Sequence, residues 1–333
     1  MIDVSRGTLK PTHSLPDFAL YVSFFPQIIA GPIERPQKLL PQIESERIWK
    51  AEFFYNAWPL IVMGFFKKIV IADNIKIISD QIFSLNEPSK FLLIMGTLAF
   101  TLQVLADFSG YTDMSRGFAL LFGFQTSENF NLPYTSLTPT DFWNRWHITL
   151  SNWLRDYIFF PIGRSLKRSR IKLPQWLILS IPPIATMFVS GLWHGAGWNY
   201  ILWGLYYGAL ISVYQLIGIR GDWAPRSLFA RGLAWFIMFS LIVVGWAMFR
   251  APSLAWLGNI IFHLPFLRSQ DDLIVGLIAL SMTIVYSVPL LIKWGLDKYE
   301  KNGWLLPAYY AVATVLIIVF INATSPDFIY NQF

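Results

Sequence analysis

The sequence has no cysteine and little charge. The absence of Cys from all 333 residues excludes a disulfide framework, a thiolate nucleophile and cysteine-based zinc or iron–sulfur sites. Charged residues make up 14% and hydrophobic residues 55% of the chain, whereas about 25% of a soluble domain is charged. The 15 Trp and 28 Phe suit a bilayer interface, where aromatic rings are favoured. This composition predicts a membrane protein.

Several motifs of soluble enzymes are also missing. The chain has no His-Glu-x-x-His metal motif, no Gly-x-Ser-x-Gly elbow and no glycine-rich phosphate loop. A soluble His-x-x-x-x-Asp acyltransferase signature is absent too, because Asn152 and Asn199 stand where the aspartate would follow His147 and His194. The net charge of +6 indicates basic cytoplasmic loops rather than affinity for nucleic acid. We therefore expect no metal, no tightly bound cofactor and no nucleic-acid partner.

Apolar runs alternate with polar segments along the chain, without a fixed-period repeat or a soluble domain. Residues 1–15 are polar and are no signal peptide. The expected membrane segments are 58–72, 91–106, 174–193, 198–218, 232–249, 273–292 and 305–322. The loops 163–173, 219–231 and 293–303 are rich in Lys and Arg, which predicts that they face the cytoplasm. We expect an all-α, polytopic integral membrane protein of the inner (plasma) membrane, with one domain over residues 1–333.

Three apolar segments are interrupted. The run at 18–33 contains two prolines and a glycine and is shorter than the roughly 20 residues of a span. It predicts a broken or re-entrant helix, which is tolerated only against protein or a cavity. Lys67 and Lys68 cut the run at 58–72 and are expected to snorkel to the interface from a helix end. Asp107 and Asp113 lie in a short polar hinge, which indicates either a buried polar elbow or an ordinary loop.

A helix start is predicted at Thr138, which is followed by Pro139 and by Asp141 three residues later. The helix is expected to continue through 142–156. The residues expected to share one side are Trp143, His147, Leu150 and Leu154, overlapped by Trp146, Trp153 and Tyr157. This helix is too polar to span lipid, so it would lie on the membrane surface or line a cavity.

The stretch 186–200 combines small residues with two tryptophans around His194. The small residues are Ser190, Gly191, Gly195, Ala196 and Gly197, and the tryptophans are Trp193 and Trp198. An ionisable side chain at membrane depth indicates a functional site. The alternative is a histidine that is hydrogen-bonded between helices and only stabilises packing. The glycines are expected to let backbone and substrate approach closely.

The histidines offer general-base chemistry. Imidazole titrates near neutrality, so it can take a proton from an alcohol and return it to a leaving group. We expect His194 to be the base and His147 to face the same cavity, where it would place donor or acceptor. Asp107, Asp113 and Arg145 are possible orienting groups. The other two histidines lie in a polar lead-in and a loop and carry no such prediction.

Five stretches follow one another in order along the chain. They are 24–33, 66–74, 107–113 with 128–131, 142–151 with 155–157, and the segment Ser-Gly-Leu-Trp-His-Gly-Ala at 190–196, followed by Trp203 and Gly204. Together they resemble the membrane-bound O-acyltransferase (MBOAT) family, and within it the alginate O-acetyltransferase-type branch that modifies exported polysaccharides. The resemblance runs from about residue 21 to the C-terminus.

The resemblance implies a helical bundle with re-entrant or broken helices around a central cavity. It implies acyl transfer from a cytoplasmic thioester, such as acetyl-CoA, to hydroxyls of an exported polysaccharide such as alginate. His194 matches the family's invariant histidine and His147 its second motif histidine. Substrate or donor contacts are expected at Arg145, Trp146, Asp107, Asp113, Trp193 and Asn199. The implied partners are the lipid bilayer, a periplasmic acetyltransferase and the polysaccharide-export machinery.

The chain departs from the family pattern in two places. Asn144 stands where many relatives have a basic residue, which would alter one contact. Relatives also begin with several membrane helices before the Phe-Phe-Pro motif, whereas here a short lead-in precedes Phe24. We therefore expect an N-terminally truncated chain that is less stable or less active alone, because broken backbone exposed to lipid is costly.

Two other functions remain open from the sequence. A transporter could relay protons through intramembrane histidines, but transporters usually have internal symmetry between halves, and none is visible. A scaffold would hold partners without catalysis. Acyl transfer in purified membranes would separate the enzyme from both alternatives, and the genomic neighbours would indicate the acceptor.

Overall fold

Every described element of the chain is helical. The computed structural model describes residues 2–28, 31–48, 50–300 and 303–321, and no strand occurs in them. This confirms the all-α prediction. Residues 29–30 of the first interrupted segment, 301–302 of the third basic loop and residue 322 of the last expected span lie outside the described residues.

The elements follow one another in this order: α1 Ile2–Ser5, α2 Leu15–Val22, α3 Phe25–Ile28, α4 Pro36–Glu44, α5 Ala51–Phe65, the π-helix η1 Phe66–Ala72, α6 Asp73–Phe83, α7 Lys90–Leu121, the 3₁₀ turn η2 Pro133–Thr135, α8 Pro139–Arg145, α9 Ile148–Leu154, the π-helix η3 Arg155–Phe159, α10 Phe160–Arg168, α11 Gln175–His194, α12 Trp198–Leu216, α13 Leu228–Arg250, α14 Leu254–His263, α15 Gln270–Tyr299 and α16 Leu305–Phe320.

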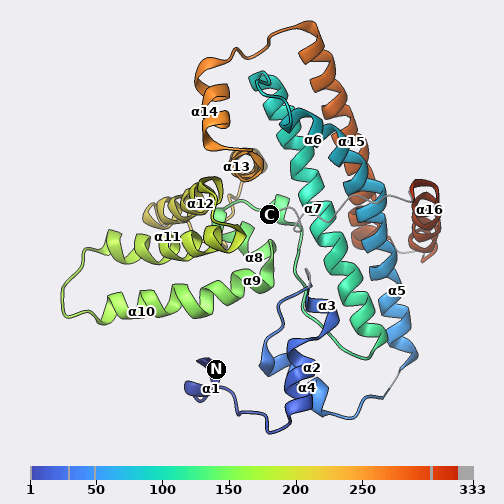
Figure 1. Ribbon diagram of the computed structural model, residues 1–333, viewed down its shortest axis with the longest axis vertical. Helices are drawn as coiled ribbons and strands as arrows, with labels where there is room; N and C mark the ends of the chain where they lie inside the picture. The colour runs from blue at the N-terminus through green and yellow to red at the C-terminus, as the bar shows by residue number, and fades with distance from the viewer. Residues whose placement is uncertain (1, 29–30, 49, 301–302, 322–333) are drawn as a thin grey trace.

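Among the described helices, α7, α11, α13 and α15 are long and apolar enough to cross a membrane. The expected segments at 174–193, 198–218, 232–249 and 273–292 correspond to α11, α12, α13 and α15. In Figure 1, α5, α7 and α15 run lengthwise beside one another, while α10, α11 and α12 form a second group. The short helices α8 and α9 lie between these two groups.

Glycines bring α5 and α7 into backbone contact. A Cβ on Gly64 would lie 2.7 Å from the carbonyl oxygen of Gly110. One on Gly110 would lie 2.9 Å from the carbonyl oxygen of Gly64, and one on Gly117 would lie 3.0 Å from that of Ala57. Small residues of this kind let helices approach closely where lipid gives no hydrophobic driving force. The α5–α7 pair is thereby a fixed support for the elements packed on it.

The hairpin of α11 and α12 is packed in the same way. A Cβ on Gly191 would lie 2.4 Å from the carbonyl oxygen of Tyr200, and one on Gly204 would lie 2.2 Å from that of Met187. The space beside these glycines is therefore filled by the partner helix. The expectation that Gly191 lets backbone approach closely is confirmed, and the approaching backbone of α12 fills the space that substrate was expected to use at this glycine.

An aromatic core joins α7, α8, α12 and α13. Its fully buried side chains include Phe100, Phe142, Trp203, Tyr207 and Trp246. A second, mainly aliphatic core joins α5, η1, α6 and α7 with α15 and α16. The aromatic core faces the histidines described below, so the site is built where large flat rings pack edge to face.

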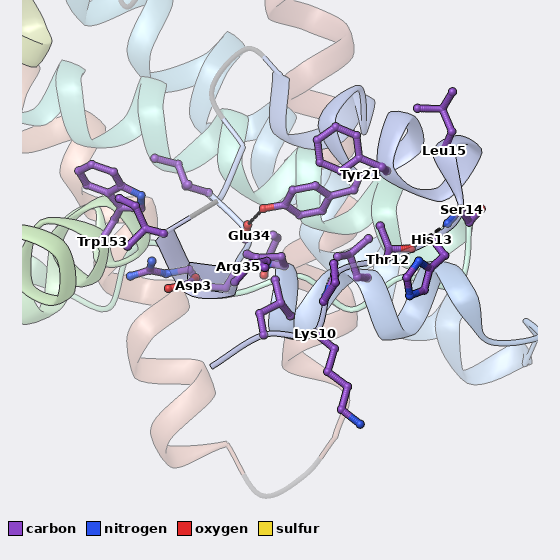
Figure 2. A pocket seen from close by; sticks show the side chains of 18 of the residues that line it. Asp3, Lys10, Thr12, His13, Ser14, Leu15, Tyr21, Glu34, Arg35 and Trp153 are labelled. Atoms are coloured by element: carbon purple, nitrogen blue, oxygen red, sulfur yellow. Dashed lines mark hydrogen bonds between the residues drawn. The ribbon is translucent and has the colours of Figure 1, made fainter. Parts of the chain in front are cut away.

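The segment at 18–33 is a broken helix, as predicted. α2 ends at Val22 and α3 begins at Phe25. A cavity of about 760 Å³ lies beside this segment, and Figure 2 shows Tyr21 donating a hydrogen bond across it to the carbonyl oxygen of Glu34. Asp3 of α1 accepts hydrogen bonds from Tyr157 of η3 and from Gln37 of α4. These bonds attach the N-terminal helices to η3.

The predicted hinge at 107–113 is wrong, because α7 runs unbroken from Lys90 to Leu121. Asp107 and Asp113 lie within the helix because lysines of η1 are close enough to pair with their carboxylates. Lys68 Nζ lies 2.9 Å from Asp107 Oδ1, and Lys67 Nζ lies 2.6 Å from Asp113 Oδ2. Snorkelling of the lysines was expected if a helix ended there, and that condition is not met because η1 continues through them. Both lysines instead pair with acids of α7, of which Asp107 is buried.

Two further predictions are corrected by the local backbone. Thr138 caps α8 as predicted, with its hydroxyl accepting from Asp141 N–H at 3.0 Å. The helix does not continue to residue 156, however, because His147 adopts a left-handed backbone with φ 40° and separates α8 from α9. His263 is not in a loop but is the last residue of α14.

Candidate active site

His147 is presented by the junction of α8 and α9. Its left-handed backbone is unusual for a residue other than glycine. The ring is buried and lies against Phe108 of α7, with ring centroids 4.8 Å apart and planes at 89°. Strained backbone of this kind persists only where surrounding contacts hold it. The contacts that do so come from the segment after α7.

Asn129 supplies those contacts. Its backbone oxygen accepts Ile148 N–H at 2.9 Å, and its side-chain Oδ1 accepts Thr149 N–H at 3.1 Å. These are two of the N–H groups that every helix start leaves without an intrahelical partner. Oδ1 also accepts the Thr149 hydroxyl at 2.9 Å and lies 3.1 Å from Nδ1 of His147. Asn129 thus caps α9 and contacts the His147 ring at once.

His194 is the last residue of α11, next to the turn that leads into α12. Gly195 follows it with φ 148°, a conformation that residues with a Cβ rarely adopt. The imidazole lies edge to face against Trp203 at 5.1 Å and against Phe249 at 5.2 Å between ring centroids. Rings from α12 and α13 therefore hold His194 from two sides.

The two imidazoles pack against the same aromatic core. His147 lies against Phe108, and His194 lies against Trp203 and Phe249, all of which belong to that core. Trp203, which contacts His194, also contacts Trp143 of α8 and Tyr207, with ring centroids 5.6 Å and 5.5 Å away. This supports the prediction that both histidines face a shared space.

Unpartnered donors surround this space. Within the described residues, the indole N–H of Trp143 and of Trp203 and the hydroxyls of Ser190 and Tyr207 are buried without a hydrogen-bond partner. Buried polar groups normally find partners. These donors can therefore serve an oxygen atom of a substrate that enters between the helices.

The expected orienting carboxylates lie outside this group. Asp107 precedes the Phe108 that contacts His147, but its carboxylate pairs with Lys68 and is itself 3% exposed. Asp113 lies further along α7 and pairs with Lys67. The structure therefore places both acids at the η1–α7 contact, where they support α7.

The other expected contact residues are distributed around the site. Arg145 pairs with Asp141 through Nε at 2.7 Å. Trp146 is buried between Phe130 and Trp246. Asn199 donates from Nδ2 to the carbonyl oxygen of Phe249 at 3.4 Å. Their side chains brace the aromatic core around the histidines.

Trp193 is not brought to the site. It is 60% exposed although it directly precedes His194, since successive helical residues point about 100° apart. The residues that the sequence did not single out for a role are Asn129, Thr149, Phe108, Trp203 and Phe249. No spacing rule connects Asn129 to a histidine 18 residues later. Trp203 and Asn129 stand within recognised stretches, but those stretches give no contact partners.

A cavity of about 540 Å³ adjoins this region. It reaches Phe130, whose ring centroid lies 4.9 Å from both Phe108 and Trp146. Lys67, Arg116, Lys293 and Lys298 also line it. Among the described residues, no group of three His, Asp or Glu could hold a metal ion.

Comparison with known families gives this arrangement a context. Residues 5–256 match the model of the membrane-bound O-acyltransferase family, MBOAT. The chain belongs to this family. The match covers both histidines, the α7 helix and the α11–α12 hairpin, and it ends within α14, before α15 and α16. The part of the fold shared with family members thus runs from the end of α1 to the start of α14.

Curated relatives agree with this assignment. The chain is 42% identical to the probable alginate O-acetylase of Pseudomonas aeruginosa over 258 residues, which cover 77% of this chain and 47% of that protein. It is 39% identical to the peptidoglycan O-acetyltransferase of Helicobacter pylori, covering 72% and 44%. A teichoic acid D-alanyltransferase of Bacillus subtilis is 28% identical, covering 75% and 65%. The chain spans about half the length of the acetyl-transferring relatives.

Proposed function

We propose that this membrane protein is an O-acyltransferase that moves an acetyl group from a thioester donor toward hydroxyls of an exported polysaccharide. The observation that carries the proposal is the packing of His147 and His194 against one aromatic core, within the part of the chain that matches the family. The family match and the acetyl-transferring relatives support this reaction class.

In this proposal His194 is the general base. It takes the proton of the acceptor hydroxyl as that oxygen attacks the thioester carbonyl carbon. The carbon–sulfur bond breaks, and the proton passes from the imidazolium to the departing thiolate. Buried N–H and O–H groups near Trp203 donate to the oxygen that becomes negative during the attack. His147 helps to place the donor or the acceptor.

The proposed donor, acceptor and partners are inferred from the chemistry of the site and from the relatives. Acetyl-CoA is the proposed donor and approaches from the cytoplasm. The basic segments 163–173, 219–231 and 293–303 are proposed to face the cytoplasm too, although the structure places 163–168 in α10, 228–231 in α13 and 293–299 in α15 instead of in loops. Alginate is the proposed acceptor, because the probable alginate O-acetylases share about two-fifths of the aligned residues. A periplasmic acetyltransferase and the export machinery of the inner membrane are the proposed partners, and the MBOAT domain is proposed to extend over 1–333.

The test is acetyl transfer from labelled acetyl-CoA in membranes that contain matched amounts of each variant. His194→Ala should lower the rate about 10²–10⁴-fold, the usual contribution of a general base, while still inserting in the membrane. His147→Ala should lower it less. The matched control is His263→Ala at the end of α14. Near-normal transfer by His194→Ala would contradict the proposal and would favour the non-catalytic scaffold.

A further inference from the structure

The polar groups behind His147 form a chain that starts in the broken N-terminal segment. Ile33 N–H donates to the hydroxyl oxygen of Thr149 at 3.0 Å. That hydroxyl then donates its own hydrogen to Oδ1 of Asn129 at 2.9 Å. The His147 ring approaches the same oxygen through Nδ1 at 3.1 Å. Three segments far apart in the sequence therefore meet behind one imidazole.

The orientation of the Asn129 amide is fixed by this chain. The backbone N–H of Thr149 can only donate, and it lies 3.1 Å from the amide atom in question. The Thr149 hydroxyl already accepts from Ile33 N–H, so it also donates toward that atom. An amide nitrogen there would face two donors, so the atom is the oxygen.

This orientation decides which nitrogen of His147 carries the hydrogen. Because Oδ1 can only accept, Nδ1 of His147 must donate to it. Burial disfavours the charged imidazolium. In the neutral ring, a hydrogen on Nδ1 leaves Nε2 with a free lone pair. Nε2 is thus a hydrogen-bond acceptor.

We propose that Asn129 is a positioning residue that holds His147 in the Nδ1–H form, so that Nε2 accepts a hydrogen bond from a second hydroxyl of the acceptor sugar, beside the one that reacts. The proposal rests on the proposed function, because this contact holds the acceptor in place while His194 takes the proton of the reacting hydroxyl. Thr149 and the Ile33 backbone keep Asn129 itself in place. Asn129 also caps α9, so a test must separate the effect on the ring from the effect on folding.

Two substitutions make that separation. Asn129→Asp keeps an oxygen acceptor for His147, Thr149 N–H and the Thr149 hydroxyl, whereas Asn129→Ala removes it. We expect Asn129→Ala to lower kcat about 10²-fold and Asn129→Asp to retain most of the activity. A residue that only caps α9 would also make Asn129→Asp more active than Asn129→Ala, so the two readouts that follow separate the effect on the ring from the effect on folding.

The pH profile sharpens this contrast. A carboxylate next to Nδ1–H stabilises the imidazolium, so Asn129→Asp should move the acidic limb of the activity profile to higher pH. His194 is the titratable group that acts on His147, and Asp107, on the adjoining α7, is paired with Lys68. An unshifted acidic limb in Asn129→Asp would contradict the proposal.

A second readout does not depend on activity. The chain has four histidines, and nitrogen-15 NMR of histidine-labelled protein gives two ring-nitrogen signals for each of them. His147→Gln identifies the pair that belongs to His147. We expect His147 to carry its hydrogen on Nδ1 in the unmodified protein and in Asn129→Asp. In Asn129→Ala the hydrogen should move to Nε2 in part or completely.

The matched control is Asn131→Ala, two residues away and exposed, which should change neither readout. Thr149→Val removes the hydroxyl from the chain and should weaken the preference for Nδ1–H, whereas Thr149→Ser should preserve it. A hydrogen on Nε2 of His147 in the unmodified protein would overturn the proposal. Absence of acetyl transfer with the hydrogen on Nδ1 would instead contradict the proposed function and leave the assignment of Asn129 standing.

Discussion

His147 and His194 stand at helix ends but are held in different ways. His147 begins α9 and is fixed by hydrogen bonds, which come from Asn129 and, behind it, Thr149. His194 ends α11 and lies between the rings of Trp203 and Phe249. The surroundings of His147 therefore include directional hydrogen bonds, and those of His194 include two edge-to-face ring contacts.

This difference indicates which catalytic role suits each histidine. A hydrogen bond to one ring nitrogen fixes the tautomer and so fixes the role of the other nitrogen. The edge-to-face ring contacts of His194 fix where its imidazole lies. A general base depends on such placement, and a residue that must accept a hydrogen bond depends on a fixed tautomer. The substitutions below test the surroundings of both histidines.

The largest effect is expected from Gly204→Ala, which should disrupt the packing of α11 on α12 that places His194. An added Cβ would lie 2.2 Å from the Met187 carbonyl oxygen and 3.2 Å from Gly191 Cα. Gly204→Ala should therefore separate α11 from α12 and abolish recovery of folded protein in detergent. Gly232→Ala on α13 is the control, because its Cβ would meet nothing within 4 Å, and it should stabilise by about 0.5–1 kcal/mol. Equal recovery of both variants would show that the close packing is dispensable.

The second-largest effect is expected from Lys68→Met, which should destabilise α7, the helix that carries the ring packed against His147. This residue bridges Asp107 and Asp73 at 2.9 and 2.8 Å, and Asp107 precedes the Phe108 against which His147 lies. Lys68→Met should lower the unfolding free energy by about 3 kcal/mol, because buried carboxylates lose compensation. Thermal unfolding in detergent measures this, with the exposed Lys172→Met as control. An unchanged unfolding temperature would mean that the ion cluster does not stabilise α7.

Loss of one ring that contacts His194 should have a smaller effect, on rate rather than folding. Phe249→Leu removes an edge-to-face contact at 5.2 Å and should lower kcat about 10-fold through misplacement of the imidazole. Phe262→Leu, at a residue that is 80% exposed, should leave kcat unchanged. A purely hydrophobic role for Phe249 would instead lower stability and leave kcat intact.

The smallest effect is expected at Trp193. Its side chain is 60% exposed, so Trp193→Ala should change the rate by less than about 2-fold, as expected of a surface position. Trp203→Phe removes a buried, unpartnered N–H beside His194 and should lower the rate far more in the same assay. If Trp193→Ala is the more damaging variant, the orientation of α11 in the site is wrong.

The sequence predicted the elements better than the junctions between them. Apolar runs identified α11, α13 and α15 as helices that could cross a membrane, because length and hydropathy decide whether a helix suits a bilayer. The helix cap at Thr138 and the break within 18–33 were also predicted correctly, because both depend on residues that are neighbours in the sequence. The hinge at 107–113 was mispredicted, because the lysines that neutralise its acids lie some 40 residues away on η1.

The candidate site shows the same limit. His147 and His194 were recognised from residue type and from the family resemblance. The break at His147 was missed, because it is enforced by Asn129 from outside the helix. Trp193 was chosen because it adjoins His194 in sequence, whereas Trp203 contacts that ring from the next helix. Contacts between segments decide such cases, and sequence spacing does not contain them.

The central claim is that the two histidines form one catalytic unit. The most direct test compares acetyl transfer by His147→Ala, His194→Ala and the double variant at matched membrane abundance. Residues that act as a unit are strongly non-additive, so we expect the double variant to be about as slow as His194→Ala alone. A double variant slowed by the product of the two single effects would show that the histidines act independently and would contradict this account.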